Sequence, residues 1–227
     1  MKNPFNIDDY GSSNEFQWTH EYLIKILTTG KKPILTSLYL KNAFRNIRRE
    51  DFIPQGHKAK AYQDMDIDIG HGETMDKPTV IAQMLELLKP KIGGTFLDIG
   101  TGSGWVTALL AYAAGKEGKV YSIERLQLMV DIARSNLKQY PNITNAVILF
   151  GDGSKGLAAY APYNGIHVSA AFEKIPEILI NQLKIGGKLV APTLENDIRL
   201  IERESESAFK ETIHKGYFFK RISEGVV

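Results

Sequence analysis

The spacing of apolar residues divides the 227-residue chain near residue 90. Before that point, apolar residues recur at helical spacing in three stretches, which predicts helices over about residues 14–29, 36–47 and 76–88. Thr36 can cap the second of these helices, and Pro78 suits the first turn of the third. Residues 62–72 are rich in Asp and Gly and predict a short strand with loops. We therefore expect residues 1–90 to form a helical region packed on the rest of the chain.

After residue 90, short apolar runs alternate with helical patterns. The predicted strands cover residues 95–99, 119–123, 146–150, 165–170 and 188–192, and the predicted helices cover 105–114, 126–139 and 175–183. This alternation is typical of βαβ units, in which helices cover both faces of a parallel sheet. Residues 198–203 and 217–221 predict two further strands as an antiparallel pair at the sheet edge. We expect residues 91–227 to form an α/β, Rossmann-like core that makes one compact unit with the helical region.

A glycine-rich turn follows the first predicted strand of this core. The strand leads into Asp98 and then into Gly100, Gly102 and Gly104, before an apolar helix. Glycine lets the backbone turn tightly and lets a ligand approach the main chain closely. The spacing D-x-G-x-G-x-G differs from the G-x-G-x-x-G of dinucleotide sites. The turn predicts a nucleotide-like ligand at the carboxyl end of the strand.

Acidic residues also follow the next two predicted strands. Glu124 ends the second strand, and Asp152 follows the third within Gly151-Asp152-Gly153. Because parallel strands end at one edge of a sheet, we expect Asp98, Glu124 and Asp152 to line one ligand. Glu124 can accept hydrogen bonds from ribose hydroxyls and Asp152 from an adenine amino group. This negative charge favours a cationic ligand without phosphates, such as S-adenosylmethionine. The alternative is that these residues only form turns and caps.

This pattern resembles the seven-stranded S-adenosylmethionine-dependent methyltransferases, whose sheet is mostly parallel with antiparallel final strands. A closer resemblance lies in residues 49–54, 61–64, 69–74 and 166–171, which are similar to the protein-L-isoaspartate O-methyltransferases. It covers roughly residues 37–192. The resemblance implies methyl transfer to the carboxylate of L-isoaspartyl or D-aspartyl residues in damaged proteins or peptides, as a step in repair. A carboxylate is already ionised at neutral pH, so this reaction needs orientation and no general base.

The resemblance also implies which residues form the site. Substrate contacts and catalysis fall to Thr74 and Asp76. The expected cofactor contacts are Met75, Lys77, Asp98, Gly100, Thr101, Gly102, Glu124, Arg125, Asp152 and Gly153.

The chain departs from the family pattern at the substrate side. The family's G-Q-T-I-S-x-P becomes Gly-Glu-Thr-Met-Asp-Lys-Pro at residues 72–78, so Glu73 replaces the glutamine and Asp76 the serine. The tail pattern F-V-P-L becomes Phe-Lys-Arg-Ile at residues 219–222. Asp76 can cap the following helix, and its carboxylate repels a substrate carboxylate unless Lys77 or Arg221 compensates. Alternatively, it acts as a base toward another nucleophile.

Three functional interpretations therefore stay open. The first is isoaspartyl methyl transfer, weakened or not by Asp76. The second is a related methyltransferase with a redirected substrate, such as an aspartate in a dedicated peptide or an RNA base. The third is a cofactor-binding or peptide-binding module without turnover.

Composition narrows the partners. The net charge of +2 gives no nucleic-acid signal, and we expect the basic clusters at Arg45, Arg48 and Arg49 and at Lys58 and Lys60 to be solvated. The absence of cysteine excludes disulfides and thiolate sites, and the spacing of acidic and histidine residues indicates no metal site. Residues 1–13 are polar without a signal-peptide pattern, and no apolar run is long enough to span a membrane. We expect a cytoplasmic monomer that acts on a peptide or protein.

Overall fold

The computed structural model describes residues 18–227. Residues 14–17 of the first predicted helix and the polar N-terminal stretch lie outside this range. The N-terminal half holds helices α1 (His20–Thr28), α2 (Leu38–Asn46) and α3 (Pro78–Leu88), the 3-10 helices η2 (Arg49–Phe52) and η3 (Gln55–Lys60), and an antiparallel hairpin of β1 (Ile67–Gly70) and β2 (Glu73–Met75). Strand β1 and the turn of the hairpin lie in residues 62–72, which were predicted to mix strand and loop, and β2 follows directly after them.

The C-terminal half is a seven-stranded sheet with the order β5-β4-β3-β6-β7-β8-β9. The strands are β3 (Thr95–Ile99), β4 (Lys119–Glu124), β5 (Ala146–Phe150), β6 (Tyr163–Val168), β7 (Leu183–Thr193), β8 (Asp197–Arg203) and β9 (Phe209–Lys215). The helices between them are α4 (Trp105–Ala114), α5 (Gln127–Leu137), η4 (Ala158–Tyr160) and α6 (Glu177–Asn181). Neighbouring strands from β5 to β7 are parallel, and β8 and β9 are antiparallel. The predicted Rossmann-like sheet, mostly parallel with antiparallel final strands, is confirmed.

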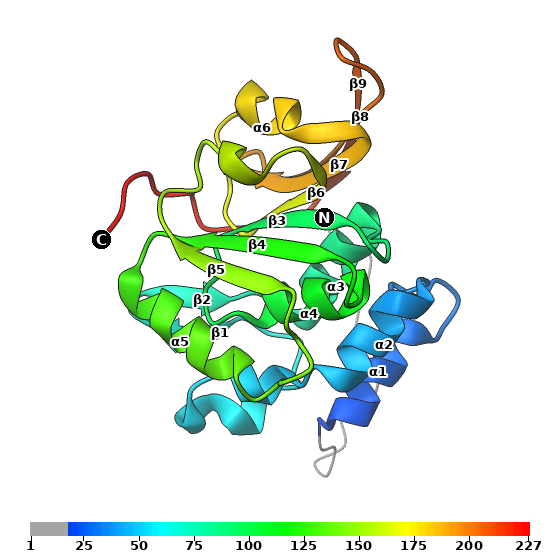
Figure 1. Cartoon of the computed structure of the whole chain (residues 1–227). Helices are drawn as coiled ribbons and strands as arrows, with labels where there is room; N and C mark the ends of the chain where they lie inside the picture. Colours follow the sequence, from blue (N-terminus) through cyan, green and yellow to red (C-terminus); the bar gives the residue numbers. More distant parts are fainter. Residues whose placement is uncertain (1–17) are drawn as a thin grey trace.

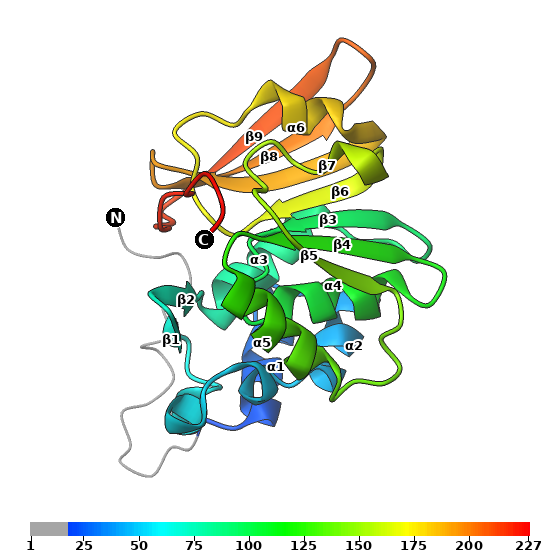
Figure 2. The ribbon, with the colours of Figure 1, turned by 60° about the vertical axis from the view of Figure 1, so that its left-hand side comes forward.

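Helices cover both faces of the sheet (Figures 1 and 2). Helices α3, α4 and α5 pack on one face, and α6 packs on the other. Helices α1 and α2 form a further layer, since α2 contacts α4 and α1 contacts α2. Helix α4 is therefore enclosed, and all its residues except Tyr112 are buried. This explains why its sequence is apolar all round instead of showing one apolar stripe.

The start of α4 requires glycine. Gly104 has a φ of +96°, and a Cβ built there lies 2.9 Å from Leu137 Cδ1 and 3.2 Å from Ala133 Cβ on α5. A side chain at this position is disfavoured both by the backbone conformation and by the packing of α5. The glycine turn and the α4–α5 contact are thus fixed by the same residue.

Two local predictions are wrong. Thr36 does not cap α2, whose N-cap position is Ser37; the Thr36 hydroxyl and N–H instead bind the Glu86 carboxylate of α3. The final strand is β9 and not residues 217–221. Strand β9 is an exposed edge strand with mostly polar side chains, so its period-2 pattern is weak, whereas residues 217–221 include apolar side chains that face a cavity.

None of the helices in the described part of the chain is long and apolar enough to cross a membrane.

Candidate active site

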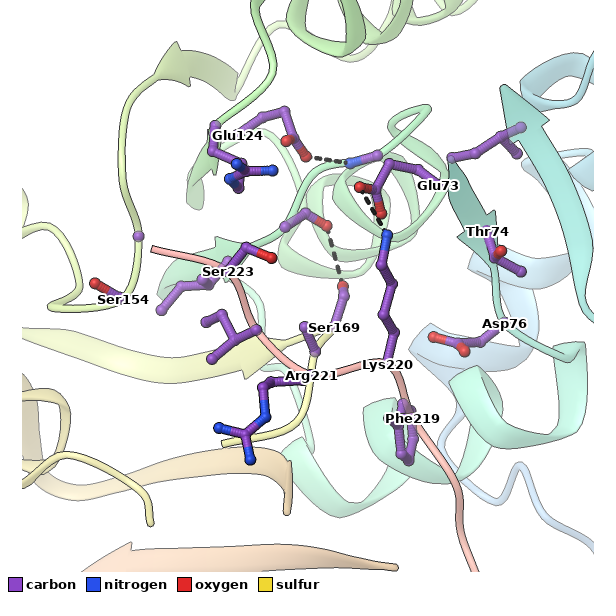
Figure 3. A pocket seen from close by; sticks show the side chains of 18 of the residues that line it. Glu73, Thr74, Asp76, Glu124, Ser154, Ser169, Phe219, Lys220, Arg221 and Ser223 are labelled. Atoms are coloured by element: carbon purple, nitrogen blue, oxygen red, sulfur yellow. Dashed lines mark hydrogen bonds and ion pairs between the residues drawn. The ribbon is translucent and has the colours of Figure 1, made fainter. Parts of the chain in front are cut away.

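A cavity of about 300 Å³ opens at the carboxyl ends of β3, β4 and β6 and beside the turn after β5 (Figure 3). The hairpin β1–β2 forms one wall, and residues 218–223 of the C-terminal tail cross the opposite side. This is the edge of an α/β sheet at which ligands bind, and the volume is that of a small-molecule site, ~300–1,000 Å³.

The cavity brings together most of the predicted site residues. Those that line it are Thr74, Asp76, Gly100, Gly102, Glu124, Arg125 and Gly153. Met75 and Thr101 line a small hollow beside the glycine turn, and Lys77 lines a neighbouring groove. Asp98 and Asp152 do not line these spaces. The acidic cluster predicted from the strand ends is therefore only partly formed at the cavity surface.

Glu124 is held in place by the glycine turn. Its carboxylate accepts hydrogen bonds from the backbone N–H of Gly102, at 2.9 Å, and from that of Leu126, at 3.0 Å. Burial raises the pKa of Glu124, against the effect of these N–H donors. A carboxylate can accept about four hydrogen bonds, so acceptor capacity is left for a ligand. Glu124 therefore presents a fixed, partly desolvated acceptor to the cavity.

Asp98 lies behind the turn instead of facing the cavity. It is fully buried, with Oδ1 2.9 Å from His167 Nδ1 and Oδ2 accepting from Thr107 Oγ1 at 2.6 Å. His167 is itself fully buried within β6. Ser122 joins the same network and lies 2.6 Å from the hydroxyl of Thr101 in the turn. Asp98 thus supports the glycine turn from beneath and does not line the cavity.

Asp152 is engaged by the C-terminal tail. Its carboxylate accepts from the N–H groups of Ser154 and Gly225, each at 2.8 Å. Burial alone would raise the pKa of Asp152, but these donors outweigh it and hold the pKa below its usual value. The Arg125 guanidinium donates to the Gly225 carbonyl at 3.1 Å. The tail therefore covers the end of the site where Asp152 and Arg125 were predicted to meet the cofactor.

Asp76 faces the cavity and does not cap a helix (Figure 3). Helix α3 begins at Pro78 with Lys77 at the N-cap position, and the N–H of Thr79 binds Asp64 instead, at 3.0 Å. Burial, followed by the neighbouring carboxylate of Asp66, raises the pKa of Asp76 to about 7. The capping interpretation is wrong because Asp64, twelve residues earlier, supplies that hydrogen bond.

A buried guanidinium holds this wall from behind. Arg49 is 1% exposed; it donates to the carbonyls of Ala61 at 2.9 Å, Met65 at 3.0 Å and Asp76 at 3.0 Å, and lies over the ring of Trp105. Burial lowers the pKa of Arg49 to about 10, despite three nearby carboxylates, so it stays charged at neutral pH. The expectation of a solvated cluster is wrong for this residue. The only indication in the sequence that Arg49 has a structural role was its position in residues 49–54, which resemble the family.

The tail supplies a cation that the sequence analysis did not single out. Lys220 Nζ donates to the Gly72 carbonyl at 2.9 Å and pairs with Glu73 Oε1 at 3.1 Å, so the tail is bound to the hairpin (Figure 3). Arg221, one of the two cations considered as compensating Asp76, pairs instead with Glu173 at 3.4 Å. The signal was the replacement of an uncharged pair in the family's tail pattern by two cations.

Comparison with known proteins identifies the family. The family model for protein-L-isoaspartate(D-aspartate) O-methyltransferase matches residues 19–224. The chain belongs to this family. Among curated protein-L-isoaspartate O-methyltransferases, that of Aeropyrum pernix is 39% identical over 170 residues, or 74% of this chain and 65% of that protein. The Methanothermobacter thermautotrophicus protein is 38% identical, over 75% of this chain and 80% of its own length.

Solved isoaspartate methyltransferases share the fold. One superposes with a TM-score of 0.78 at 26% identity, over 90% of this chain and 66% of that one. A Plasmodium falciparum protein described as belonging to the same family, and crystallised with S-adenosyl-L-homocysteine, gives the same TM-score at 24% identity. It matches 90% of this chain and 98% of its own. The second likeness bears on the fold alone.

The residues present fit the cofactor that an isoaspartate methyltransferase uses. Gly100 and Gly102 have φ values of +88° and +52°, and a Cβ at Gly153 would lie 2.7 Å from Ile99. Gly100 and Gly102 border the cavity, and Gly153 packs closely against β3. Glu124 provides an acceptor suited to ribose hydroxyls, and its carboxylate can also attract a sulfonium.

Proposed function

We propose that this chain transfers a methyl group from S-adenosylmethionine to the carboxylate of L-isoaspartyl, or D-aspartyl, residues in peptides or proteins. The observation that carries the proposal is a single cavity with two unlike halves. One half is the glycine turn with Glu124, and the other is the open wall formed by Thr74 and Asp76. Family membership and the substrates named for the relatives point to the same reaction.

The cofactor half fixes a ligand through backbone and carboxylate groups. Gly100, Gly102 and Gly153 would border the ligand, and Glu124 would accept hydrogen bonds from its ribose. Asp152 and Arg125 would contact the ligand after their hydrogen bonds to Gly225 of the tail break. When bound, S-adenosylmethionine supplies a methyl group to an acceptor oxygen, whose new bond forms as the carbon–sulfur bond breaks and its electron pair stays on sulfur. The protein's own contribution is orientation in a site that excludes water, worth ~7–11 kcal/mol of the barrier in favourable cases.

The substrate half handles an acceptor that needs no deprotonation. A peptide carboxylate is ionised at neutral pH, so no side chain has to act as a base. Thr74 lies at the cavity and can donate a hydrogen bond to the substrate. Asp76 occupies the position of the family's serine, and its raised pKa keeps part of the population protonated and able to donate in the same way.

The second candidate function is methyl transfer to a different acceptor. The observation that favours it is the pair of acidic replacements, Glu73 and Asp76, on the substrate wall. An ionised Asp76 repels a carboxylate and could instead accept a proton from an amide, amine or hydroxyl. The net charge of +2 argues mildly against an RNA acceptor, because binding to phosphates needs a basic surface.

Two measurements test the proposal. Calorimetry with S-adenosylhomocysteine should show binding that Glu124→Ala weakens. Labelled methyl transfer should then modify an isoaspartyl peptide and leave the matched aspartyl peptide unmodified. Cofactor binding with no ester formed on either peptide would refute the proposed reaction and favour the silent binding module.

We further propose that the protein acts in the cytoplasm as a monomer on peptide or protein substrates, and that residues 1–90 and 91–227 form one unit. Buried side chains of α1, α2, α3 and α4 in a common apolar cluster support the last point. Light scattering and a single cooperative thermal transition are the tests.

A further inference from the structure

The substrate half of the cavity is crowded with negative charge. The ionisable residues of the whole lining are the carboxylates Asp66, Glu73, Asp76 and Glu124 and the cations Arg125, Lys220 and Arg221. Glu124 serves the cofactor half, and the other three carboxylates, Asp66, Glu73 and Asp76, line the hairpin side of the cavity, where an anionic acceptor has to bind. Carboxylates that close to one another repel strongly in a partly desolvated site. An acceptor carboxylate therefore needs a cation on this side.

Lys220 is the lining cation that reaches the substrate wall. Arg125 donates to the Gly225 carbonyl at the cofactor end. The Arg221 guanidinium turns away and pairs with Glu173 outside the lining (Figure 3). Lys220 instead extends along the cavity to the hairpin, where its ammonium group pairs with Glu73 (Figure 3).

The backbone of Lys220 is fixed while its ammonium group keeps freedom to move. Its carbonyl accepts from the Ala171 N–H at 2.8 Å, and the N–H of Ile222 donates to the Ala171 carbonyl at 2.9 Å. The side chain is 57% exposed. An ammonium has three N–H donors, and those to Gly72 and Glu73 use two. One donor is left for a ligand without breaking the present contacts.

We propose that Lys220 binds the acceptor carboxylate of the substrate and distinguishes it from the methylated product. This inference rests on the proposed function. Methyl transfer joins the acceptor oxygen to the methyl carbon and leaves the bonding pair of the broken carbon–sulfur bond on sulfur. The anionic acceptor becomes a neutral ester, which no longer attracts the ammonium. The ammonium of Lys220 then pairs with Glu73 alone, and the neutral ester is released.

The family's tail pattern has valine at the position of Lys220. Recognition of the acceptor by a lysine is therefore a feature of this chain and not of the family pattern. It accompanies the acidic replacements at Glu73 and Asp76 on the facing wall. The added cation offsets the added negative charge. It also keeps the site selective for an anionic acceptor.

The test compares two peptides that differ only in charge at the acceptor. One carries isoaspartate, and the other carries isoasparagine, whose α-carboxamide is a neutral isostere. Binding of each is measured by calorimetry with S-adenosylhomocysteine present, for the wild type, for Lys220→Met and for the control Lys116→Met. Lys116 is exposed in the turn between α4 and β4, at the opposite edge of the sheet, so its replacement changes net charge equally.

We expect the wild type and Lys116→Met to prefer the isoaspartyl peptide by about tenfold or more, the size of a charge-assisted hydrogen bond. Lys220→Met should lose this preference and bind the isoaspartyl peptide no more tightly than the isoasparagine peptide, because the carboxylates of the wall remain. Glu73→Gln should strengthen binding of the isoaspartyl peptide several-fold, because it frees Lys220 and removes a repulsive charge. Unchanged affinity for S-adenosylhomocysteine shows that each variant is folded.

A Lys220→Met variant that keeps the wild-type preference overturns the inference, and so does a wild type that binds the two peptides equally. The proposed function fails on a different result, namely cofactor binding without ester formation. The two outcomes are separate because the binding comparison needs no turnover.

Discussion

Replacing Asp76 by serine tests whether this carboxyl acts in its protonated form. The groups that face it are Asp66, which raises its pKa together with burial, and Arg49 and Lys77, which lower it. With a pKa of about 7, about half of the side chains are protonated at pH 7 and about a tenth at pH 8. If only the acid form receives a substrate carboxylate, kcat/KM falls roughly fivefold over that interval and about tenfold per unit beyond.

The assay is labelled methyl transfer to an isoaspartyl peptide at saturating S-adenosylmethionine, from pH 6 to pH 9. The acceptor is ionised throughout this range, so its own titration does not shape the profile. The Asp76→Ser variant, whose hydroxyl is neutral, should give a flat profile and exceed the wild type at pH 8. A wild-type rate that rises above pH 7 refutes this reasoning and assigns Asp76 the role of a base. If the wild type turns over rapidly at pH 8 and Asp76→Ser is no faster, the hypothesis that Asp76 weakens isoaspartyl methyl transfer is refuted.

The same titration has a consequence for stability. The pKa of Asp76 rises from 3.8 to about 7 on folding, so the folded state holds the proton more tightly between these values. The contribution of this proton to the free energy of unfolding is therefore fully present below about pH 3.8. It declines between about pH 3.8 and pH 7, and the free energy of unfolding does not change further above that range because of Asp76. A shift of about three units corresponds to at most about 4 kcal/mol, and access of water from the cavity reduces this to about 1–2 kcal/mol. Asp76→Asn should exceed the wild type in urea denaturation by that amount at pH 8 and match it near pH 4; equal stability at pH 8 contradicts the assignment.

Other predictions follow from single contacts. Arg49→Met leaves several buried carbonyls without a donor, so unfolding in urea should require about 3 kcal/mol less, with Arg49→Lys intermediate; a neutral effect would show that these carbonyls find other partners. Glu124→Ala removes the acceptor fixed by the glycine turn and should weaken S-adenosylhomocysteine binding about 10–100-fold in calorimetry, whereas an unchanged affinity would place the ribose elsewhere. Gly104→Ala should lower stability by roughly 1–2 kcal/mol in thermal melting, because of its backbone conformation and its contact with α5; a melting temperature equal to that of the wild type would mean that the turn tolerates a Cβ.

The elements that could be predicted are those whose apolar residues run without a break, whether the element is largely buried, like β3 and α4, or partly exposed, like the edge strand β5. Strands β3 and β5 and helix α4 have the predicted bounds, since apolar runs bounded by glycine and polar residues leave few alternatives. The other edge strand, β9, could not be predicted in the same way. Strand β9 is paired on one side only, so its sequence is free to be polar, and the apolar residues of 217–221 serve the cavity instead.

The sequence predicted where the site residues lie along the chain, but it did not predict which way their side chains point. The spacing put Asp98 at the end of its strand, yet its rotamer is set by His167, 69 positions later, and by Thr107. Likewise, Asp76 was expected to accept a hydrogen bond from the first turn of the following helix, but the N–H of Thr79 donates to Asp64 instead. Contacts between residues far apart in sequence decide such choices, and a local pattern carries no information about them.

Arg49 gives the site an architectural property of its own. One guanidinium binds main-chain carbonyls from separate stretches of the hairpin region, so the course of that wall depends on backbone atoms that every sequence possesses. Side chains that project from the wall into the cavity can then be exchanged with little change to its shape. Such a frame is evolvable: the chemistry presented to the acceptor can drift from serine and glutamine to aspartate and glutamate while the scaffold persists.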